Sequence, residues 1–288
     1  MGSIDAKLVG ELRKRTGLPM MICKRALIEA DGDLELAAEN LRKLGLKTAE
    51  KVAGRTLKDG LVFLDADDEQ TAAVAVLCET DFVANSEDFR AFGRALLQAV
   101  ASGAAGESGE GEALNDVQLS TGSTARGALE DLIARIRENI ALGPYACFKP
   151  NGGSVSHYLH HDSKKALLVQ LDGDGVRGNA AAETLGKDLA MHLTFHSATK
   201  ALSRDDLDPD WVAKEREIFA AQVQDQPEER REAIAKGKLN KRLKEVVLLE
   251  QPFVRDEKQS VQQRIEAVAK EIGSDLKVRR YARIAAKE

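Results

Sequence analysis

The sequence predicts an α+β protein that combines a three-helix N-terminal module, a core of two related halves with antiparallel strands, and a projecting helical hairpin. Three observations predict this class. Apolar residues recur at helical spacing three times within residues 1–46. Residues 59–142 and 143–288 each place two strand-like apolar runs before a helical pattern. Residues 208–250 are highly charged, with sparse apolar positions divided by Pro227, as in two antiparallel helices with a narrow apolar seam.

Composition limits the possible functions. The 42 Lys and Arg against 47 Asp and Glu give a net charge of −5, which argues against a broad phosphate-neutralising surface and against specific nucleic-acid binding. Cys23, Cys78 and Cys147 are odd in number and far apart, which argues against a disulfide framework and fits a cytoplasmic protein. With no apolar run near the ~20 residues that span a bilayer and no secretory signal, we expect no membrane partner.

The first 46 residues form the predicted N-terminal module. Its three helices are expected to end at Gly17, Gly32 and Gly45, and Asp33 can cap the third. The helical apolar positions are Ile4, Leu8 and Leu12, then Met20, Cys23 and Leu27, and then Ala37, Leu41 and Leu44. A bundle of this size is marginal alone and is typical of a binding module. Residues 47–58, rich in Lys, Ala, Thr and Gly, are predicted to be a linker.

The first half of the core covers residues 59–142. Strands are expected over 61–64 and 71–78, followed by a helix that Ser86 caps. The Gly-, Ala- and Ser-rich stretch from 101 to 111 predicts a flexible insertion. A second helix follows, with apolar positions Leu129, Leu132, Ile133, Ile136 and Ile140 on one face.

The second half, residues 143–288, repeats this order loosely. Strands are expected over 155–160 and 166–171, and a helix is expected from Asn179 to about Phe195. The shared order of two strands and a helix indicates a weak internal duplication.

The helical hairpin and the elements after it complete this half. The hairpin is predicted over about residues 208–250. Ser260 and Gly273 bound a further helix. The final strand is expected from 277 to 285, although Arg280 interrupts its alternation of polar and apolar residues.

One motif resembles that of an enzyme. Residues 173–178 match the dinucleotide-binding fingerprint G-x-G-x-x-G after a predicted strand and before a predicted helix. However, the motif does not open an alternating βαβ run, and residues 197–202 lack the acid expected about 20 positions on. We therefore interpret it as a turn and expect no cofactor, with a dinucleotide-dependent enzyme as a rival class.

Two histidine groups are candidate metal ligands. His192 and His196 are four residues apart on a predicted helix, but Leu193 replaces the glutamate that a metalloprotease motif requires. His157, His160 and His161 cluster on a strand without an obvious fourth ligand. A structural pair is the favoured interpretation for His192 and His196. Ordinary surface or contact histidines are favoured for His157, His160 and His161, and no metal is expected.

A basic run lies in the predicted hairpin. It extends from Arg230 to Lys244 and holds seven Lys and Arg against Glu232. A solvated helix face is the favoured interpretation, and contact with a partner or RNA is the alternative.

The most unusual feature is Thr80-Asp81-Phe82-Val83, where a strand is expected to turn into a helix. Such turns are normally polar, so a bulky aromatic residue beside an acid is out of place. Phe82 either folds back as a hydrophobic staple on the following helix or projects toward a partner, since aromatic side chains anchor protein interfaces.

With these residues the chain resembles the elongation factor Ts family, the nucleotide-exchange factors of the GTPase elongation factor Tu. The strongest similarity lies in two segments, with weaker support in two others. The strong segments are Leu12-Arg13-Lys14-Arg15-Thr16-Gly17 through Met20-Met21 to Cys23-Lys24-Arg25-Ala26-Leu27, and Cys78-Glu79-Thr80-Asp81-Phe82-Val83-Ala84. The weaker ones are Ala190-Met191-His192 and Gln251-Pro252-Phe253-Val254.

The resemblance implies a fold and a function. The fold is a module like a ubiquitin-associated (UBA) domain, followed by an α+β core of two halves with a projecting hairpin. The function is guanine-nucleotide exchange on elongation factor Tu, without covalent chemistry and without a nucleotide of its own. A non-catalytic adaptor or chaperone-like binding protein with a UBA-like module is the alternative.

The resemblance also implies three groups of site residues. Thr80, Asp81, Phe82 and Val83 would enter near the nucleotide and magnesium of the GTPase. Arg13, Met20, Met21 and Lys24 would grip its nucleotide domain, and Tyr158 and His160 would contact a second GTPase domain. The chain departs from the family pattern at Gly17-Leu18-Pro19, Ile22, Ala141-Leu142 and His161-Asp162-Ser163-Lys164. These departures bear on the finer contacts and leave the central turn intact.

Overall fold

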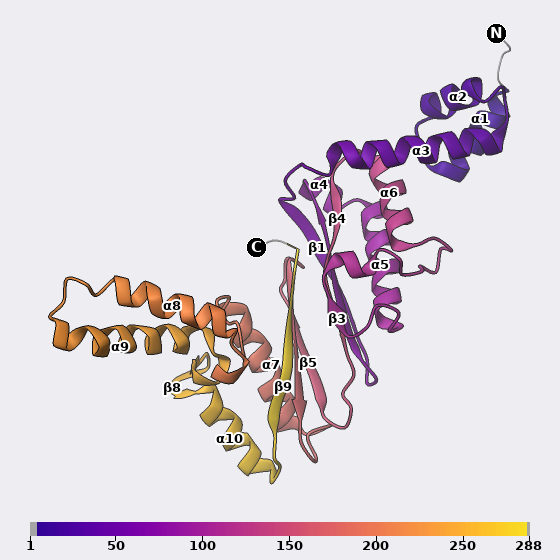
Figure 1. The fold of residues 1–288 in the computed structure, drawn as a ribbon. Coiled ribbons are helices and arrows are strands. Elements are labelled where there is room, and N and C mark those ends of the chain that lie inside the picture. Colours follow the sequence, from indigo (N-terminus) through magenta and orange to yellow (C-terminus); the bar gives the residue numbers. More distant parts are fainter. Residues whose placement is uncertain (1–4, 287–288) are drawn as a thin grey trace.

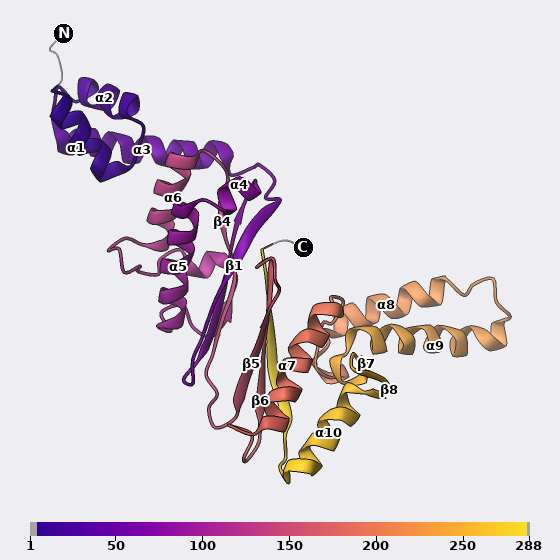
Figure 2. The ribbon, with the colours of Figure 1, turned by 180° about the vertical axis from the view of Figure 1, so that it is seen from behind.

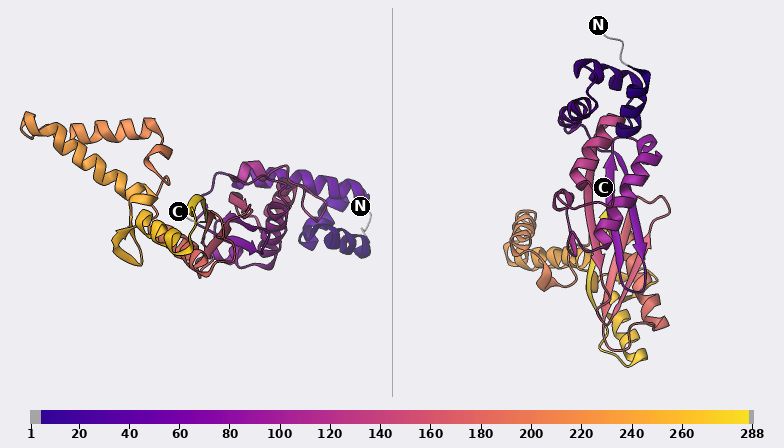
Figure 3. Two further views of the ribbon diagram at one scale, coloured as in Figure 1. Left: turned by 90° about the horizontal axis from the view of Figure 1, so that it is seen from below. Right: turned by 90° about the vertical axis from the view of Figure 1, so that its right-hand side faces the viewer.

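The computed structural model describes residues 5–286, which form an N-terminal helical module, a body of two packed sheets and a projecting helix pair (Figure 1). The module and the helix pair lie at opposite ends of an elongated molecule (Figure 3). Within the described residues, no helix is long and apolar enough to cross a membrane. The predicted α+β class is confirmed.

The N-terminal module consists of α1 (Ala6–Thr16), α2 (Met20–Glu29) and the first part of α3 (Leu34–Val52). Asp33 caps α3 by accepting hydrogen bonds from two backbone N–H groups, and Gly17 ends α1 in the left-handed conformation. Leu12, Cys23 and Leu27 are fully buried in the core of the bundle, as their helical spacing predicts. Met20 and Leu44, on the same predicted apolar faces, are instead 52% and 50% exposed, and Ile4 lies outside the described residues.

The third helix is longer than the sequence predicts. The prediction that it ends at Gly45 is wrong, because α3 continues to Val52 and takes up the first half of the predicted linker. Gly45 is buried beside α6 (Ala125–Ile136), where an added Cβ atom would lie 3.2 Å from the Cβ of Ala134. This glycine therefore serves close helix packing and not helix termination.

The first sheet has four antiparallel strands in the order β1-β2-β4-β3. The strands are β1 (Asp59–Ala66), β2 (Thr71–Cys78), β3 (Ser108–Gly109) and β4 (Ile140–Phe148). The helix α5 (Glu87–Ala101), α6 and the short turn η1 (Gly111–Leu114) cover its outer face. Ser86 caps α5 as predicted, and Phe89 and Leu96 of this helix are fully buried against the sheet.

Two predictions in this half are wrong. The second helix does not reach Ile140, because Arg137 takes a positive φ of 66° and ends α6, and Ile140 begins the unpredicted strand β4. Gly143 and Pro144 weaken the strand pattern of β4, and a register shift between Val74 and Val76 of β2 accommodates them. The expected flexible insertion contains β3, which pairs with β4.

The second sheet has three antiparallel strands in the order β5-β6-β9. Its strands are β5 (Ser154–Leu159), β6 (Lys165–Asp172) and β9 (Lys277–Ala285), and its outer face carries α7 (Ala180–Phe195) and α10 (Val261–Ile272). A small two-stranded ribbon, β7 (Pro252–Phe253) and β8 (Asp256–Ser260), leads into α10. The predicted caps at Ser260 and Gly273 bound α10.

The two sheets pack face to face between their covering helices (Figure 2). Small residues dominate the layer between them: Ala73, Ala75, Ala146, Ala166 and Ala286 pack with Val62, Phe148, Leu168 and Ile284. The backbone N–H of Val62 donates to the carbonyl of Ser163 across this layer at 2.7 Å. The halves therefore form one continuous body.

The internal duplication is visible in the way each half packs its helix. Gly93 is the seventh residue of α5 and lies against Phe63 of β1, and Gly186 is the seventh residue of α7 and lies against Ser156 of β5. A Cβ atom would lie 2.1 Å from Phe63 at the first position and 2.2 Å from Ser156 at the second. Both halves thus use a helical glycine to bring the helix onto the first strand of its hairpin.

The projecting pair consists of α8 (Pro209–Ala221) and α9 (Glu228–Val246). The one-turn segments η2 (Arg204–Asp206) and η3 (Leu248–Glu250) connect the pair to the body. No residue of α8 is buried, whereas Leu239, Leu243 and Val246 of α9 are buried. The apolar cluster with Leu239, Leu243 and Val246 adjoins the second half at the base of the pair, and Val223, 2% exposed, is buried in the connection at the outer end.

Candidate functional site

A single helical turn, α4 (Asp81–Ala84), follows β2 and carries the unusual aromatic residue. The Phe82 side chain is 85% exposed, while Val83 and Ala84 are buried in the core of the first half. The staple interpretation of Phe82 is therefore wrong, because the ring is not folded back onto α5. Water contact is unfavourable for a phenyl ring, and this ring is held outward by the burial of its neighbours. We call Thr80, Asp81, Phe82 and Val83 the tip.

Hydrogen bonds from distant residues hold the tip in place. The Thr80 hydroxyl donates to the Glu138 carboxylate at 2.9 Å and accepts from the backbone N–H of Val83 at 3.4 Å. The Glu79 carboxylate accepts from the backbone N–H of Asn139 at 2.6 Å. Residues 138 and 139 precede β4, so the first sheet supports the tip directly.

The charge at the tip belongs to Asp81. Within the described part of the chain, its carboxylate has no hydrogen-bond or ion-pair partner. Its backbone carbonyl accepts from the side-chain amide of Asn85 at 2.9 Å, and Arg90 donates to the same amide group at 2.8 Å. The backbone is thus fixed while the carboxylate and the Phe82 ring stay available to another molecule.

The N-terminal module presents a second exposed surface. Met20 is 52% and Met21 68% exposed on α2, and Lys24 and Arg13 are exposed as well. Ile28, 48% exposed, extends the apolar part of this surface by one helical turn from Lys24. Ile28 is not among the predicted contact residues, although its spacing of seven from Met21 places it on the same side of α2.

The structure brings the tip close to the module and to the β5–β6 turn. The tip lies beside the C-terminal part of α3 (Figures 1 and 2). The Lys164 ammonium of the β5–β6 turn donates to the carbonyl of Gly60 at 2.8 Å, at the start of β1. Asp59 pairs there with Cys78, two residues before Thr80. All three predicted groups of site residues therefore lie toward one end of the body.

The predicted second-domain contacts are less exposed than the tip. Tyr158 is half-buried against the core of the second half. His160 is also half-buried, and its Nδ1 lies 2.9 Å from the Asp162 carboxylate. The imidazole and its neighbour His161 are 4.2 Å apart between ring centroids, and together they form a polar turn at the end of β5.

His192 and His196 are structural, as the sequence favoured. The Nδ1 of buried His192 accepts from the backbone N–H of Val254 at 3.2 Å, and Nε2 lies 2.8 Å from the side-chain oxygen of Gln251. Both ring nitrogens are occupied, and His196 stacks on the ring at 4.1 Å. Burial lowers the pKa of His192 to about 4. In residues 5–286, no group of three or more His, Cys, Asp or Glu side chains could hold a metal ion.

The glycine-rich motif is a turn between β6 and α7. Gly173, Gly175 and Gly178 all take positive φ, and Asn179 caps α7. Both neighbours of β6 are antiparallel to it, whereas a dinucleotide-binding fold requires parallel strands. The side chain of Arg177 donates to the carbonyl of Asp68 at 2.7 Å, so this turn meets the β1–β2 turn.

Part of the basic run is used within the helix pair. Arg242 contacts the carboxylates of Glu215 and Glu245, and Lys238 donates to Gln222 at 3.2 Å. Arg231 is half-buried and donates to the backbone carbonyl of Gln226 at 2.7 Å, while Arg230, Lys236, Lys241 and Lys244 are exposed.

The fold and the site define an α+β protein with two exposed surfaces of the kind that protein interfaces use: an outward aromatic ring and carboxylate on an anchored tip, and a methionine-bearing helix in the N-terminal module. Comparison with known proteins identifies its family. The family model described as Elongation factor TS matches residues 79–288. The chain is 39% identical over 284 residues to elongation factor Ts of Clostridium botulinum strain Alaska E43, which covers 97% of this chain and 92% of that protein.

Other relatives agree. The chain is 38% identical to elongation factor Ts of Maricaulis maris over 294 residues and 38% identical to that of Clostridioides difficile over 287 residues. These alignments cover 99% and 98% of this chain and 92% of each relative. The chain belongs to the elongation factor Ts family, a family of translation elongation factors.

Proposed function

We propose that this chain binds the GTPase elongation factor Tu and promotes release of its GDP, so that GTP can enter. The observation that carries the proposal is the 85% exposed phenyl ring of Phe82 on a turn whose next two residues, Val83 and Ala84, are anchored in the core. Family membership supports the choice of partner. The chain acts by binding alone and needs no cofactor, and this role belongs in the cytoplasm.

The Phe82 ring enters an apolar gap between helices of the GTPase. Burying one Phe side chain contributes roughly 1.5–3 kcal/mol. A tenfold weakening of nucleotide binding requires about 1.4 kcal/mol of differential contact, and a thousandfold weakening about 4 kcal/mol. Phe82 alone is therefore insufficient, and other contacts must favour the same nucleotide-free state.

Asp81 supplies a second contribution. An unpaired carboxylate brought beside a bound nucleotide competes with the phosphates for magnesium and repels them. Since α4 begins at Asp81, the carboxylate moves with the ring and cannot be placed without it. The pair therefore couples insertion of an apolar group with disturbance of the magnesium and phosphate site.

The module and the second half supply affinity. The thioether chains of Met20 and Met21 adapt to irregular apolar surfaces, and Arg13 and Lys24 add charge around them. The Tyr158 and His160 end of β5 contacts a second domain of the GTPase. Linkage makes this effect reciprocal. If these contacts weaken nucleotide binding to the GTPase by a given factor, bound nucleotide weakens binding of this chain to the GTPase by the same factor.

The test is release of a fluorescent GDP analogue from elongation factor Tu, followed by stopped flow. The Phe82→Ala variant should stimulate release at least about tenfold less than the unaltered chain at saturating concentration, because the wedge contact is lost. Ile218→Ala, which removes another exposed apolar side chain far from the tip on α8, should stimulate normally.

Other outcomes identify the rival classes. Equal stimulation by Phe82→Ala and the unaltered chain at saturation would contradict the wedge mechanism, in which the Phe82 ring inserts between helices of the GTPase. Binding without any stimulation by the unaltered chain would indicate an adaptor. A bound nicotinamide or flavin in the absorbance spectrum of the purified protein would indicate a dinucleotide enzyme.

A further inference from the structure

The helix α3 belongs to two hydrophobic cores at once. Ala37 and Leu41, in its first half, pack in the core of the N-terminal module. Val52, near its C-terminal end, packs in the core of the first half of the body, with Ala49 against the same core. An unbroken helix with both ends embedded in packed cores is a stiff connection, unlike a linker of flexible residues.

A close helix crossing fixes the middle of α3. Gly45 faces Ala134 of α6, and an added Cβ would lie 3.2 Å from the Cβ of Ala134 and 3.8 Å from the carbonyl of Glu130. Ala134 also packs against the core of the module. The two small residues therefore let α3 and α6 approach closely, and α6 contacts the module and the body together.

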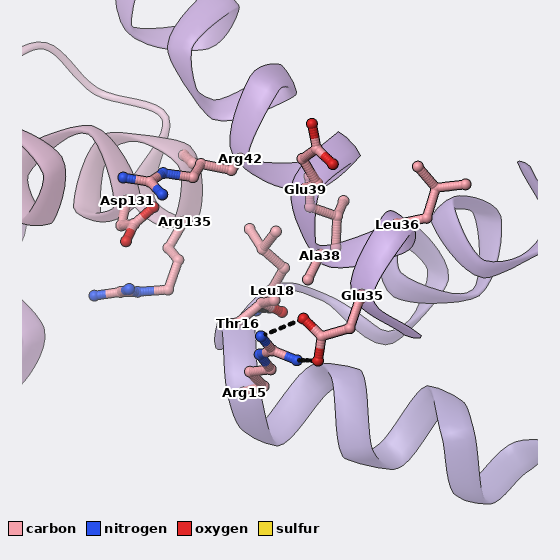
Figure 4. Close-up of a pocket in the computed structure, with 12 residues that line it drawn as sticks. Arg15, Thr16, Leu18, Glu35, Leu36, Ala38, Glu39, Arg42, Asp131 and Arg135 are labelled. Atoms are coloured by element: carbon pink, nitrogen blue, oxygen red, sulfur yellow. Dashed lines mark hydrogen bonds and ion pairs between the residues drawn. The ribbon is translucent and has the colours of Figure 1, made fainter. Parts of the chain in front are cut away.

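A groove of about 530 Å³ runs between the module and α6 (Figure 4). Arg42 of α3 extends toward α6, and its guanidinium lies next to Asp131 on one side of the groove. Arg135 approaches Gly17, where an added Cβ would lie 2.8 Å from its Cδ, and its guanidinium lies 3.6 Å from the Asp88 carboxylate of α5. The turn between α1 and α2 is therefore braced against the body as well.

The end of α3 is tied to the tip through one buried asparagine. The side-chain amide of Asn139, 6% exposed, donates to the carbonyl of Arg55 at 2.7 Å and to that of Ala53 at 3.3 Å. Its backbone N–H donates to Glu79, the residue before Thr80. Arg55 also contacts the Glu79 carboxylate at 3.3 Å. Asn139 and Glu79 thus connect the segment after α3 to the start of the tip.

From this geometry we infer that α3 holds the module and the tip as one rigid unit, with Gly45, Ala134 and Asn139 as positioning residues. The inference rests on the proposed function and deepens it: the distance between the methionine surface of α2 and Phe82 is set before the GTPase binds. When two contact surfaces are held at a fixed separation, binding of the first places the second at a high effective concentration next to its own site on the same partner. A flexible connection lowers this effective concentration and therefore weakens overall binding.

Distance measurement on the free chain tests the rigidity directly. Cysteines introduced by Glu29→Cys on α2 and Gln98→Cys on α5 lie at exposed positions, whereas Cys23, Cys78 and Cys147 are buried and react poorly with spin labels. Pulsed electron resonance should give a single narrow distance distribution that does not change when elongation factor Tu is added. A broad distribution in the free chain would overturn the inference.

A variant at the helix crossing tests the consequence for exchange. Gly45→Leu places a large side chain against Ala134, so it should broaden or shift the distance distribution and raise the concentration for half-maximal stimulation about tenfold or more. The maximal rate at saturation should stay within about twofold, because the tip is unchanged. Because a partly unfolded variant would also raise the apparent half-maximal concentration, urea unfolding must show that Gly45→Leu is fully folded under the assay conditions. A lowered maximal rate of the folded variant would count against positioning.

Two further glycine variants serve as controls for this test. Gly45→Ala adds only one methyl group and should restore most of the lost affinity. Gly10→Leu is the matched control, since Gly10 is a helical glycine of the same module and nothing lies within 4 Å of an added Cβ there. Unchanged half-maximal concentrations for Gly45→Leu would overturn the inference. A narrow distribution together with full activity of Phe82→Ala would instead refute the wedge and leave the rigid unit standing.

Discussion

At the scale of single residues, Phe82 and Val83 are chain neighbours with opposite environments. Val83 is 8% exposed and anchors the turn, while Phe82 is 85% exposed. The sequence revealed this site because an aromatic residue beside an acid is unusual in a polar turn. Its support by Glu138 and Asn139 was not predictable, since these residues lie about 60 positions further along the chain and reach the tip only through β4.

The buried His192 predicts a pH dependence of stability. Burial lowers its pKa to about 4, while in the unfolded chain the imidazole titrates near 6.5. Between these values the unfolded state binds more protons, so the stabilisation is complete above about pH 6.5 and is lost as the pH falls toward 4. The loss should be about 1.4 kcal/mol per pH unit, measured by urea unfolding at several pH values.

The His192→Gln variant distinguishes the contribution of His192 to this pH dependence from that of other titratable residues. His192→Gln keeps a polar side chain but cannot titrate, so its stability should fall less steeply with pH than that of the unaltered chain. Parallel pH profiles for His192→Gln and the unaltered chain would contradict the assignment.

At the scale of elements, the surroundings of one glycine in α5 and one in α1 predict stability changes of opposite sign for two glycine-to-alanine substitutions. In Gly93→Ala the new Cβ meets the Phe63 ring, whose centroid lies 6.4 Å from that of Phe89 in the packed core. Overpacking costs about 1–3 kcal/mol, which exceeds the gain of about 1 kcal/mol in helix propensity. Gly10→Ala meets no such obstacle and should stabilise the chain.

Urea midpoints of the two alanine variants measure this difference. A lower midpoint for Gly93→Ala and an equal or higher one for Gly10→Ala are expected. A stabilised Gly93→Ala would mean that Phe63 moves aside at little cost.

The accuracy of the sequence-based boundaries follows from local chemistry. Helix α10 was predicted well because Ser260 and Gly273 are strong start and stop signals. The end of α3 was mispredicted because Gly45 looks like a stop signal and acts in packing. Strand β4 was missed because Ile140 continues the helical spacing of α6 and Gly143 and Pro144 interrupt the strand pattern.

At the scale of the whole molecule, Arg280 joins the two halves. Its guanidinium donates to the fully buried Gln170 at 2.8 Å and to Glu107 of the first half at 2.5 Å, and it lies 4.1 Å from the centre of the Phe148 ring. A register shift between Gln170 and Leu171 accompanies the break that Arg280 makes in the alternation of β9. One sequence does not reveal such a shift, because the partner strand lies about 110 residues away.

The Arg280→Met variant should therefore lose about 1–3 kcal/mol of unfolding free energy, mostly because Gln170 is left buried without its donor. The exposed Glu107 carboxylate contributes little to this loss. Arg279→Met is the neighbouring control: its ion pair with Asp172 is half-exposed, and its removal should cost less than about 1 kcal/mol. Equal losses for both variants, measured by calorimetry, would show that Arg280 has no special role between the sheets.

The order of layers was predicted only in outline. Two strand-like apolar runs followed by a helical pattern predicted each half of the core, and the structure contains both halves. The small side chains that join the two sheets, such as Ala73 and Ala166, give no strand signal, since alanine favours helices and is depleted in strands.

The helix pair α8 and α9 has a thermodynamic consequence for the protein. Because α8 buries no residue and the apolar cluster of the pair includes Leu239, Leu243 and Val246, the outer turns depend on local contacts only. Segments of this kind open and reclose by themselves while the remainder stays native. Amide protons near Pro227 should then exchange with solvent far sooner than those of β2. A single melting temperature would describe the two sheets but not the helix pair α8 and α9.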